Sequence, residues 1–166
     1  MASANTSMAI EIERKFWIKN KNWKVAANAP KGTVIKQGYL STDKERTVRV
    51  RIYGTKGILT IKGKSVGMTR AEFEYEIPID DAIALLKLCH QPIIEKVRHK
   101  IPLDNVIWEV DEFEGVNEGL ILAEVELESE EQNVNIPNWV GEEVTGDIRF
   151  YNSSLVNNPF TRWTMD

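Results

Sequence analysis

Three residues near the start of the chain, Glu11, Glu13 and Lys15, alternate with other side chains in the segment IEIERKF. In an extended strand every second side chain lies on the same face, so this spacing places two carboxylates and one amine together. A face open to solvent is the simplest explanation of such a pattern. A binding site for a divalent cation or a phosphate is the alternative, because carboxylates coordinate hard cations and amines bind phosphate.

Like-charged residues two positions apart recur along the sequence. They are Arg49 and Arg51, Lys62 and Lys64, Glu72, Glu74 and Glu76, Lys96, Arg98 and Lys100, Glu109 and Asp111, and Glu124, Glu126 and Glu128. An antiparallel sheet with one solvated face accounts for the alternation, since ion pairs across such a face contribute little. Like charges on one strand face repel each other, however, so these doublets stabilise a sheet poorly and favour a shared role in coordination.

A closed barrel with the charged faces inside is the second interpretation. Closure removes the exposed edges of the sheet, and eight strands leave room for one small ligand. Buried, unpaired charges are costly, so such an interior must hold water, a ligand or a metal. Basic doublets suit a chain of phosphates. Acidic doublets suit a divalent cation lying between carboxylate and phosphate oxygens.

The elements that would position these residues are mostly short strands. Extended patterns occupy 9–18, 33–40, 47–53, 58–64, 70–77, 94–101, 106–113 and 120–127. A helical pattern covers Asp80–Leu88, with aspartates at its start and Pro92 beyond its end, and weaker helical patterns cover Asn20–Ala29 and Asp147–Val156. The sequence predicts an antiparallel, mainly β fold.

The composition limits the possible partners. The chain has 166 residues, a net charge of −4 and a pI near 5.4, so it lacks the positive field expected of a protein that binds nucleic acid or an anionic membrane. A single cysteine, Cys89, and two histidines exclude an intrachain disulfide and a Cys/His zinc site. With no apolar run of membrane-spanning length, we expect a cytoplasmic protein, with a disordered leader at 1–8 and a single domain at 9–166.

The ordered set of motifs resembles the CYTH domain superfamily, also called triphosphate tunnel metalloenzymes. In chain order the motifs are EIERKF, QGYL, RVR, TIK, RAEFE, EKVR, WEVDEF, AEVEL and EEVTGDIRFYN, which together cover nearly all of the chain after residue 8. The resemblance implies an α+β, mainly β fold: a closed eight-stranded antiparallel barrel forming a tunnel, with a charged interior and a few helices packed outside. It also implies that the tunnel binds a triphosphate together with Mg²⁺ or Mn²⁺.

The resemblance also implies roles for individual residues. The metal-binding carboxylates would be Glu11, Glu13, Glu124 and Glu126, supported by Glu72, Glu74 and Asp111. The triphosphate clamp would be Arg49, Arg51, Lys62, Arg70, Arg98 and Arg149. Lys15 and Tyr39 would activate water. Many relatives have Arg/Lys-Tyr where this chain has Arg149-Phe150 followed by Tyr151, which leaves the role of that aromatic residue open.

The residues of the EIERKF motif and the short chain most resemble those of the short bacterial triphosphatases, so we expect hydrolysis of inorganic tripolyphosphate. Thiamine triphosphatase and class IV adenylate cyclase are the alternatives within the superfamily. A module that binds polyphosphate or a nucleotide without turnover is the alternative outside enzymes. The sequence leaves open whether the chain forms a homodimer.

Overall fold

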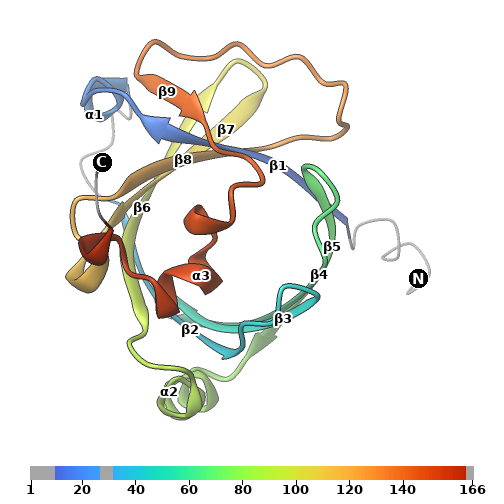
Figure 1. Ribbon diagram of the computed structural model, residues 1–166, viewed down its shortest axis with the longest axis vertical. Helices are drawn as coiled ribbons and strands as arrows, with labels where there is room; N and C mark the ends of the chain where they lie inside the picture. Colours follow the sequence, from blue (N-terminus) through green and yellow to red (C-terminus); the bar gives the residue numbers. More distant parts are fainter. Residues whose placement is uncertain (1–9, 27–31, 164–166) are drawn as a thin grey trace.

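The computed structural model describes residues 10–26 and 32–163, most of which lie in one curved antiparallel sheet (Figure 1). Its strands are β1 (Ile10–Ile18), β2 (Thr33–Ser41), β3 (Arg46–Tyr53), β4 (Lys56–Gly63), β5 (Thr69–Ile77), β6 (Ile94–Leu103), β7 (Val106–Phe113), β8 (Ile121–Glu126) and β9 (Val140–Glu143). The expected leader at 1–8 lies outside the described residues.

The sheet closes into a barrel because β1 pairs on both sides. Its first residues, Ile10–Ile12, pair with β5, and its residues Glu13–Trp17 pair with β8. The strand order around the ring is therefore β1-β5-β4-β3-β2-β6-β7-β8, while β9 adds to the outer end of β1. The predicted closed eight-stranded barrel is confirmed, and the flat sheet with one solvated face is wrong. The additional strand β9 was not expected.

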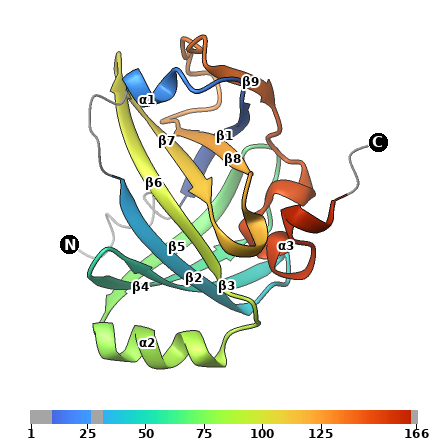
Figure 2. The ribbon, with the colours of Figure 1, turned by 90° about the vertical axis from the view of Figure 1, so that its left-hand side faces the viewer.

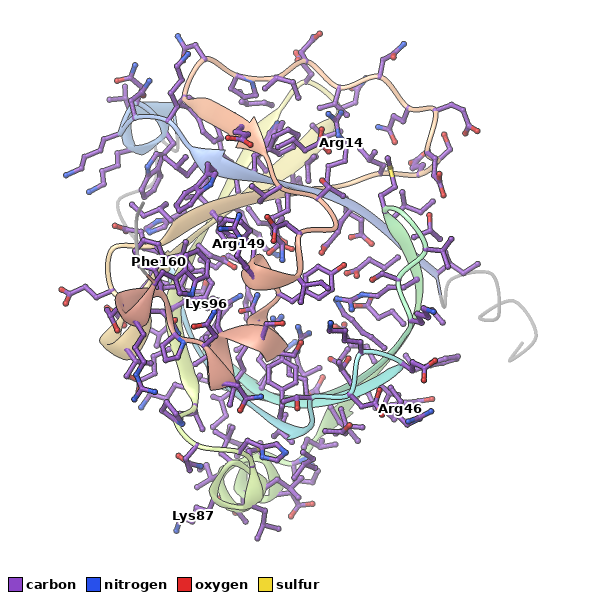
Figure 3. All side chains as sticks on the ribbon, viewed as in Figure 1. Arg14, Arg46, Lys87, Lys96, Arg149 and Phe160 are labelled. Carbon is purple, nitrogen blue, oxygen red and sulfur yellow. The ribbon has the colours of Figure 1, made fainter. Side chains whose placement is uncertain are left out.

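The barrel carries its charges inside and its apolar core outside. One apolar cluster, centred on Trp23, Trp108 and Trp139, lies beneath α1 (Trp23–Ala26) and the segment that leads to β9. The expected helix at Asn20–Ala29 is thus confined to α1 within the described residues, and 27–31 fall outside them. In Figure 3, Lys96 lies within the ring of strands whereas Arg14 points away from it.

The helix predicted at Asp80–Leu88 is confirmed as α2 (Ile79–Leu88), which packs outside the barrel on β3 and β4 (Figures 1 and 2). It follows Pro78 and ends before Cys89, a buried free thiol in the cluster beneath the helix. The packing is close, because a Cβ added at Gly57 would lie 2.8 Å from the Cβ of Ala82. None of the helices in the described ranges is long and apolar enough to span a bilayer.

The C-terminal segment differs from the single outer helix expected at Asp147–Val156. It forms η3 (Ile148–Phe150), an extended residue at Tyr151, α3 (Asn152–Asn157) and η4 (Phe160–Arg162). Figures 1 and 2 show α3 across one end of the barrel. This placement is explained by the polar and apolar side chains of α3, which lie in different surroundings. Asn152 and Ser153 face the charged interior, whereas Leu155 joins an apolar cluster outside it. A short 3-10 turn, η2 (Gly115–Asn117), connects β7 to β8.

Candidate active site

A cavity of about 350 Å³ occupies the barrel interior. All but two of the predicted site residues line it, namely Glu11, Glu13, Lys15, Tyr39, Arg49, Arg51, Lys62, Arg70, Glu72, Glu74, Arg98, Glu124 and Glu126. Strand alternation accounts for this convergence, because every second residue of a barrel strand points inward. Doublets far apart in the sequence therefore meet in one enclosed space.

The basic side is built around Arg49 and Arg51 on β3. The guanidinium of Arg51 donates through Nε to Oε1 of Gln37 at 2.8 Å. Burial, together with the charges of Arg49 and Arg98, lowers the pKa of Arg51 to about 9, so the group is charged at neutral pH although its neighbours repel it. The Nε atom of Arg49 is buried and donates to no atom of the described chain. Crowded cations with a buried donor that has no partner in the described chain are suited to binding an anion.

Lys62 and Arg70 link this basic side to β1. The ammonium of Lys62 lies 2.8 Å from a carboxylate oxygen of Glu11 and 3.3 Å from Glu72, and Arg70 Nε lies 3.5 Å from Glu11. Burial opposes ionisation of Glu11, but Lys62 and Arg70 outweigh burial and lower the pKa of this carboxyl group. Glu11 is therefore neutralised by basic side chains in this structure.

The acidic side is compensated only in part. Arg98 lies 3.3 Å from Glu109 and 3.6 Å from Glu124. Burial opposes the charge of Glu124, but Lys15 and Arg98 lower the pKa of this carboxyl group well below its ordinary value. The register places Glu13 directly opposite Glu126, and Glu109 directly opposite Glu124. Like charges in these positions destabilise a sheet. Burial, together with Glu124 and Glu11, raises the pKa of Glu13 well above its ordinary value, and burial also raises the pKa of Glu109 and Glu126. This part of the cavity favours the uptake of positive charge.

The acidic side suits a hard divalent cation by its chemistry. As the side chains stand, no three Asp, Glu, His or Cys side chains form a ready cage within 10–26 and 32–163. The donors are nevertheless all carboxylate oxygens, which hard cations prefer, and their mutual repulsion is what a cation would relieve. Glu13, Glu124 and Glu126 would hold the ion, which would neutralise charge on bound phosphates.

Two predicted residues lie elsewhere. Asp111 is in the barrel wall, where its carboxylate accepts from Arg98 at 2.8 and 2.9 Å and lies 2.7 Å from Lys96. Burial opposes its charge, yet Arg98 and Lys96 lower the pKa of Asp111 to about 2. Arg149 is 62% exposed and pairs with Asp147 at 2.8 Å, outside the cavity lining. The carboxylate of Asp111 is therefore engaged in ion pairs, and the side chain of Arg149 faces solvent.

The aromatic residue beside Lys15 is Tyr151. The ammonium of Lys15 donates to the carbonyl oxygen of Phe150 at 3.1 Å and lies 5.5 Å from the centre of the Tyr151 ring. Tyr39 also lines the cavity, but no hydrogen bond joins it to Lys15 in the part of the chain that the structure describes. The C-terminal segment thus supplies the immediate contacts of this lysine.

Several residues of the lining had no individual role in the prediction. Lys96, Lys100 and Glu109 belong to the like-charged doublets noted in the sequence, and the structure places all three in the cavity lining. Asn152 has no such pattern. Its side-chain oxygen accepts from Gln37 Nε2 at 2.8 Å and from Lys96 Nζ at 3.1 Å, contacts made only once the C-terminal segment enters the barrel.

Comparison with known proteins agrees with the fold and the motifs. The family model described as CYTH domain matches residues 9–155. A protein named inorganic triphosphatase from Acetivibrio thermocellus is 49% identical, over 92% of this chain and 97% of its own length. Another of that name from Nitrosomonas europaea is 36% identical, over 87% and 95%. A crystal structure of an inorganic triphosphatase superposes with a TM-score of 0.59 at 32% identity, over 88% of this chain and 97% of that chain. The chain belongs to the CYTH domain family.

Proposed function

We propose that this protein is a metal-dependent inorganic triphosphatase, which hydrolyses tripolyphosphate to pyrophosphate and orthophosphate inside the barrel. The observation that carries the proposal is the division of one cavity into two charged sides. Strand β3, which carries Arg49 and Arg51, lies across the ring from β1, which carries Glu13 (Figure 1), and all three residues line the cavity. Phosphoryl transfer depends mainly on positioning and on neutralising charge, which these sides would provide.

Mg²⁺ or Mn²⁺ is the proposed cofactor, because the candidate ligands are carboxylates. Lys15 and Tyr39 are proposed to act on the attacking water, as the family resemblance implies. The proposed triphosphate clamp is Arg49, Arg51, Lys62, Arg70 and Arg98, joined by Lys96 and Lys100. Arg149 is left out of the clamp because of its exposed position.

Tripolyphosphate is favoured over organic triphosphates because basic side chains already lie over two of the aromatic rings in the cavity. The lining contains three tyrosines, Tyr39, Tyr53 and Tyr151. The Tyr151 ring already has Lys15 at 5.5 Å and Arg70 at 5.6 Å, and the Tyr53 ring has Lys100 at 5.6 Å. A thiazolium or adenine ring would have to displace these cations in order to stack there. A linear phosphate chain has no such requirement.

The setting of the enzyme is also a proposal. We assign the protein to the cytoplasm, where its free thiol Cys89 stays reduced. Its partner is a small triphosphate rather than a nucleic acid or a membrane, in keeping with the net charge of −4.

The test is phosphate release from tripolyphosphate, ATP and thiamine triphosphate, each titrated with Mg²⁺ and Mn²⁺. We expect preferential release from tripolyphosphate, dependent on metal and abolished in Glu13→Gln. Faster release from thiamine triphosphate, or a cyclic product from ATP, would select one of the related activities. Tight binding of tripolyphosphate without release of phosphate would instead identify a binding module.

A further inference from the structure

A second, smaller pocket adjoins the main cavity. It has a volume of about 30 Å³, and its own part is formed by two surface turns, one containing Ser65, Gly67 and Met68 and the other containing Thr145 and Gly146. Gly67 and Gly146 are exposed, so the pocket reaches the surface. We refer to it as the side pocket.

The two spaces share one wall. Glu11, Glu13, Lys15, Arg70 and Tyr151 line both the main cavity and the side pocket. The Tyr151 ring packs against Lys15 and Arg70, with its centre 5.5 Å from the ammonium and 5.6 Å from the guanidinium carbon. The hydrogen bond from Lys15 to the preceding carbonyl, at 3.1 Å, fixes this segment further. Tyr151 therefore forms, together with Lys15 and Arg70, part of the wall between the two spaces.

The size of the side pocket limits what it can hold. A buried water needs about 10–15 Å³ of such volume and two to four polar partners. The space of about 30 Å³ accommodates one or two waters, and its lining includes the polar residues Glu13, Lys15 and Thr145. A tetrahedral phosphate with five heavy atoms is too large for it. The pocket suits water and excludes the substrate and both products.

Its position also suits the nucleophile. Arg49 and Arg51 on β3 line the same cavity as Lys15 on β1, and β3 lies across the ring from β1 (Figure 1), so a phosphate chain that spans the cavity between these strands would end near Lys15. In-line attack requires a water on the side of the terminal phosphorus away from the leaving pyrophosphate. In that arrangement the attacking side would face Lys15 and Tyr151, which line both spaces, so water from the side pocket would reach it.

We propose that the side pocket is the inlet and waiting site for the hydrolytic water, and that Tyr151 keeps the phosphate chain out of it. The proposal rests on the proposed triphosphatase function. In the hydrolysis the water oxygen bonds to the terminal phosphorus, and the bridging P–O bond breaks with its electron pair left on pyrophosphate. The proton that the water loses is taken up by the products.

The first test blocks the inlet. Ser65→Trp blocks the side pocket with a large side chain at a residue outside the main-cavity lining, whereas Val66→Trp is a matched control in the same turn, at a residue 73% exposed and outside either lining. We expect Ser65→Trp to lower kcat for tripolyphosphate about tenfold or more with KM within about twofold, and Val66→Trp to leave both unchanged. Equal kcat in a folded Ser65→Trp protein, or equal losses in both variants, would overturn the inlet.

The second test widens it. Met68→Ala enlarges the side pocket, so methanol added to the assay should compete with water and give methyl phosphate, measured by ³¹P NMR. The wild-type protein should give orthophosphate alone. Equal yields of methyl phosphate from both proteins would mean that the nucleophile enters elsewhere. The same conclusion would follow if the Met68→Ala protein were active but formed no methyl phosphate. Failure of the wild-type protein to release any phosphate would instead refute the triphosphatase function itself.

Discussion

Replacing Asp111 with asparagine tests whether this residue balances charge in the barrel wall or binds metal. The carboxylate is 1% exposed and lies between Arg98 and Lys96, at 2.8 and 2.7 Å. Asparagine has nearly the same volume, so the change removes charge and leaves packing intact. Removing one partner of a buried ion pair costs about 3–5 kcal/mol. We expect the free energy of unfolding of the metal-free protein to fall by that amount at pH 6, measured by urea denaturation with tryptophan fluorescence.

The pH dependence of this loss has a defined sign. Asp111 has a pKa of about 2 in the folded chain and 3.8 as its ordinary value, so its contribution is complete above pH 3.8 and disappears as the pH falls through 2. The difference corresponds to about 2 kcal/mol. The variant should lack this acid-sensitive contribution. Its deficit should also shrink above pH 7, because Lys96, which has a pKa of about 7, then loses its charge.

Asp43→Asn is the matched control. Asp43 makes a 2.6 Å ion pair with Arg46, but both side chains are exposed, so the change should cost less than about 1 kcal/mol. Tripolyphosphate at a hundred times its Kd should restore about 2.7 kcal/mol to Asp111→Asn, provided that its Kd is unchanged. Unaltered stability of Asp111→Asn combined with weakened metal binding would refute the wall role and support Asp111 as a metal ligand.

Three further changes examine other parts of the cavity. Arg149→Ala should change KM for tripolyphosphate less than about twofold in steady-state assays. Arg51→Ala should raise KM about 10- to 100-fold, because a charged hydrogen bond contributes about 1.5–3 kcal/mol. Equal effects of the two substitutions would place Arg149 in the clamp. Binding of tripolyphosphate at pH 8.5 should take up nearly one proton, because Lys96 has a pKa of about 7 in the free protein and bound phosphates raise it. Calorimetry in two buffers measures this uptake, and its persistence in Lys96→Met would contradict the assignment. Asn152→Leu should lower the free energy of unfolding by about 1–3 kcal/mol, since Gln37 and Lys96 lose a shared acceptor; unchanged urea denaturation would show that these bonds contribute little.

Local periodicity explains how much of the site the sequence predicted. Glu11, Glu13 and Lys15 had to share a face once their segment was a strand, and the same holds for Arg49 and Arg51. Which face would be enclosed was not decided by the pattern alone, because an open sheet and a barrel have the same alternation. Closure depends on pairing between β1 and β5, which are more than fifty residues apart.

Residues outside the strands were harder to predict. Tyr151 and Asn152 reach the cavity because the C-terminal segment crosses one end of the barrel, and no local period reports that path (Figure 2). Arg149 shares a motif with them but falls on the outer side, where it pairs with Asp147. The helical pattern at Asp147–Val156 indicated a single helix, but the extended backbone at Tyr151 divides this segment into two short helical pieces. Arg149 lies in the first piece and Asn152 in the second, so the two side chains have different surroundings.

Cross-strand register determines which charges remain available to ligands. Direct partners of opposite sign, such as Lys62 with Glu72 and Arg98 with Asp111, compensate each other within the wall. Partners of like sign, such as Glu13 with Glu126, do not. Since β3 lies across the ring from β1 (Figure 1), one cavity holds two sets of repelling charges, the carboxylates of Glu13 and Glu126 and the guanidinium groups of Arg49 and Arg51. A cation bound on one side and a phosphate chain on the other would relieve both at once, which is why the two ligands are expected to bind cooperatively.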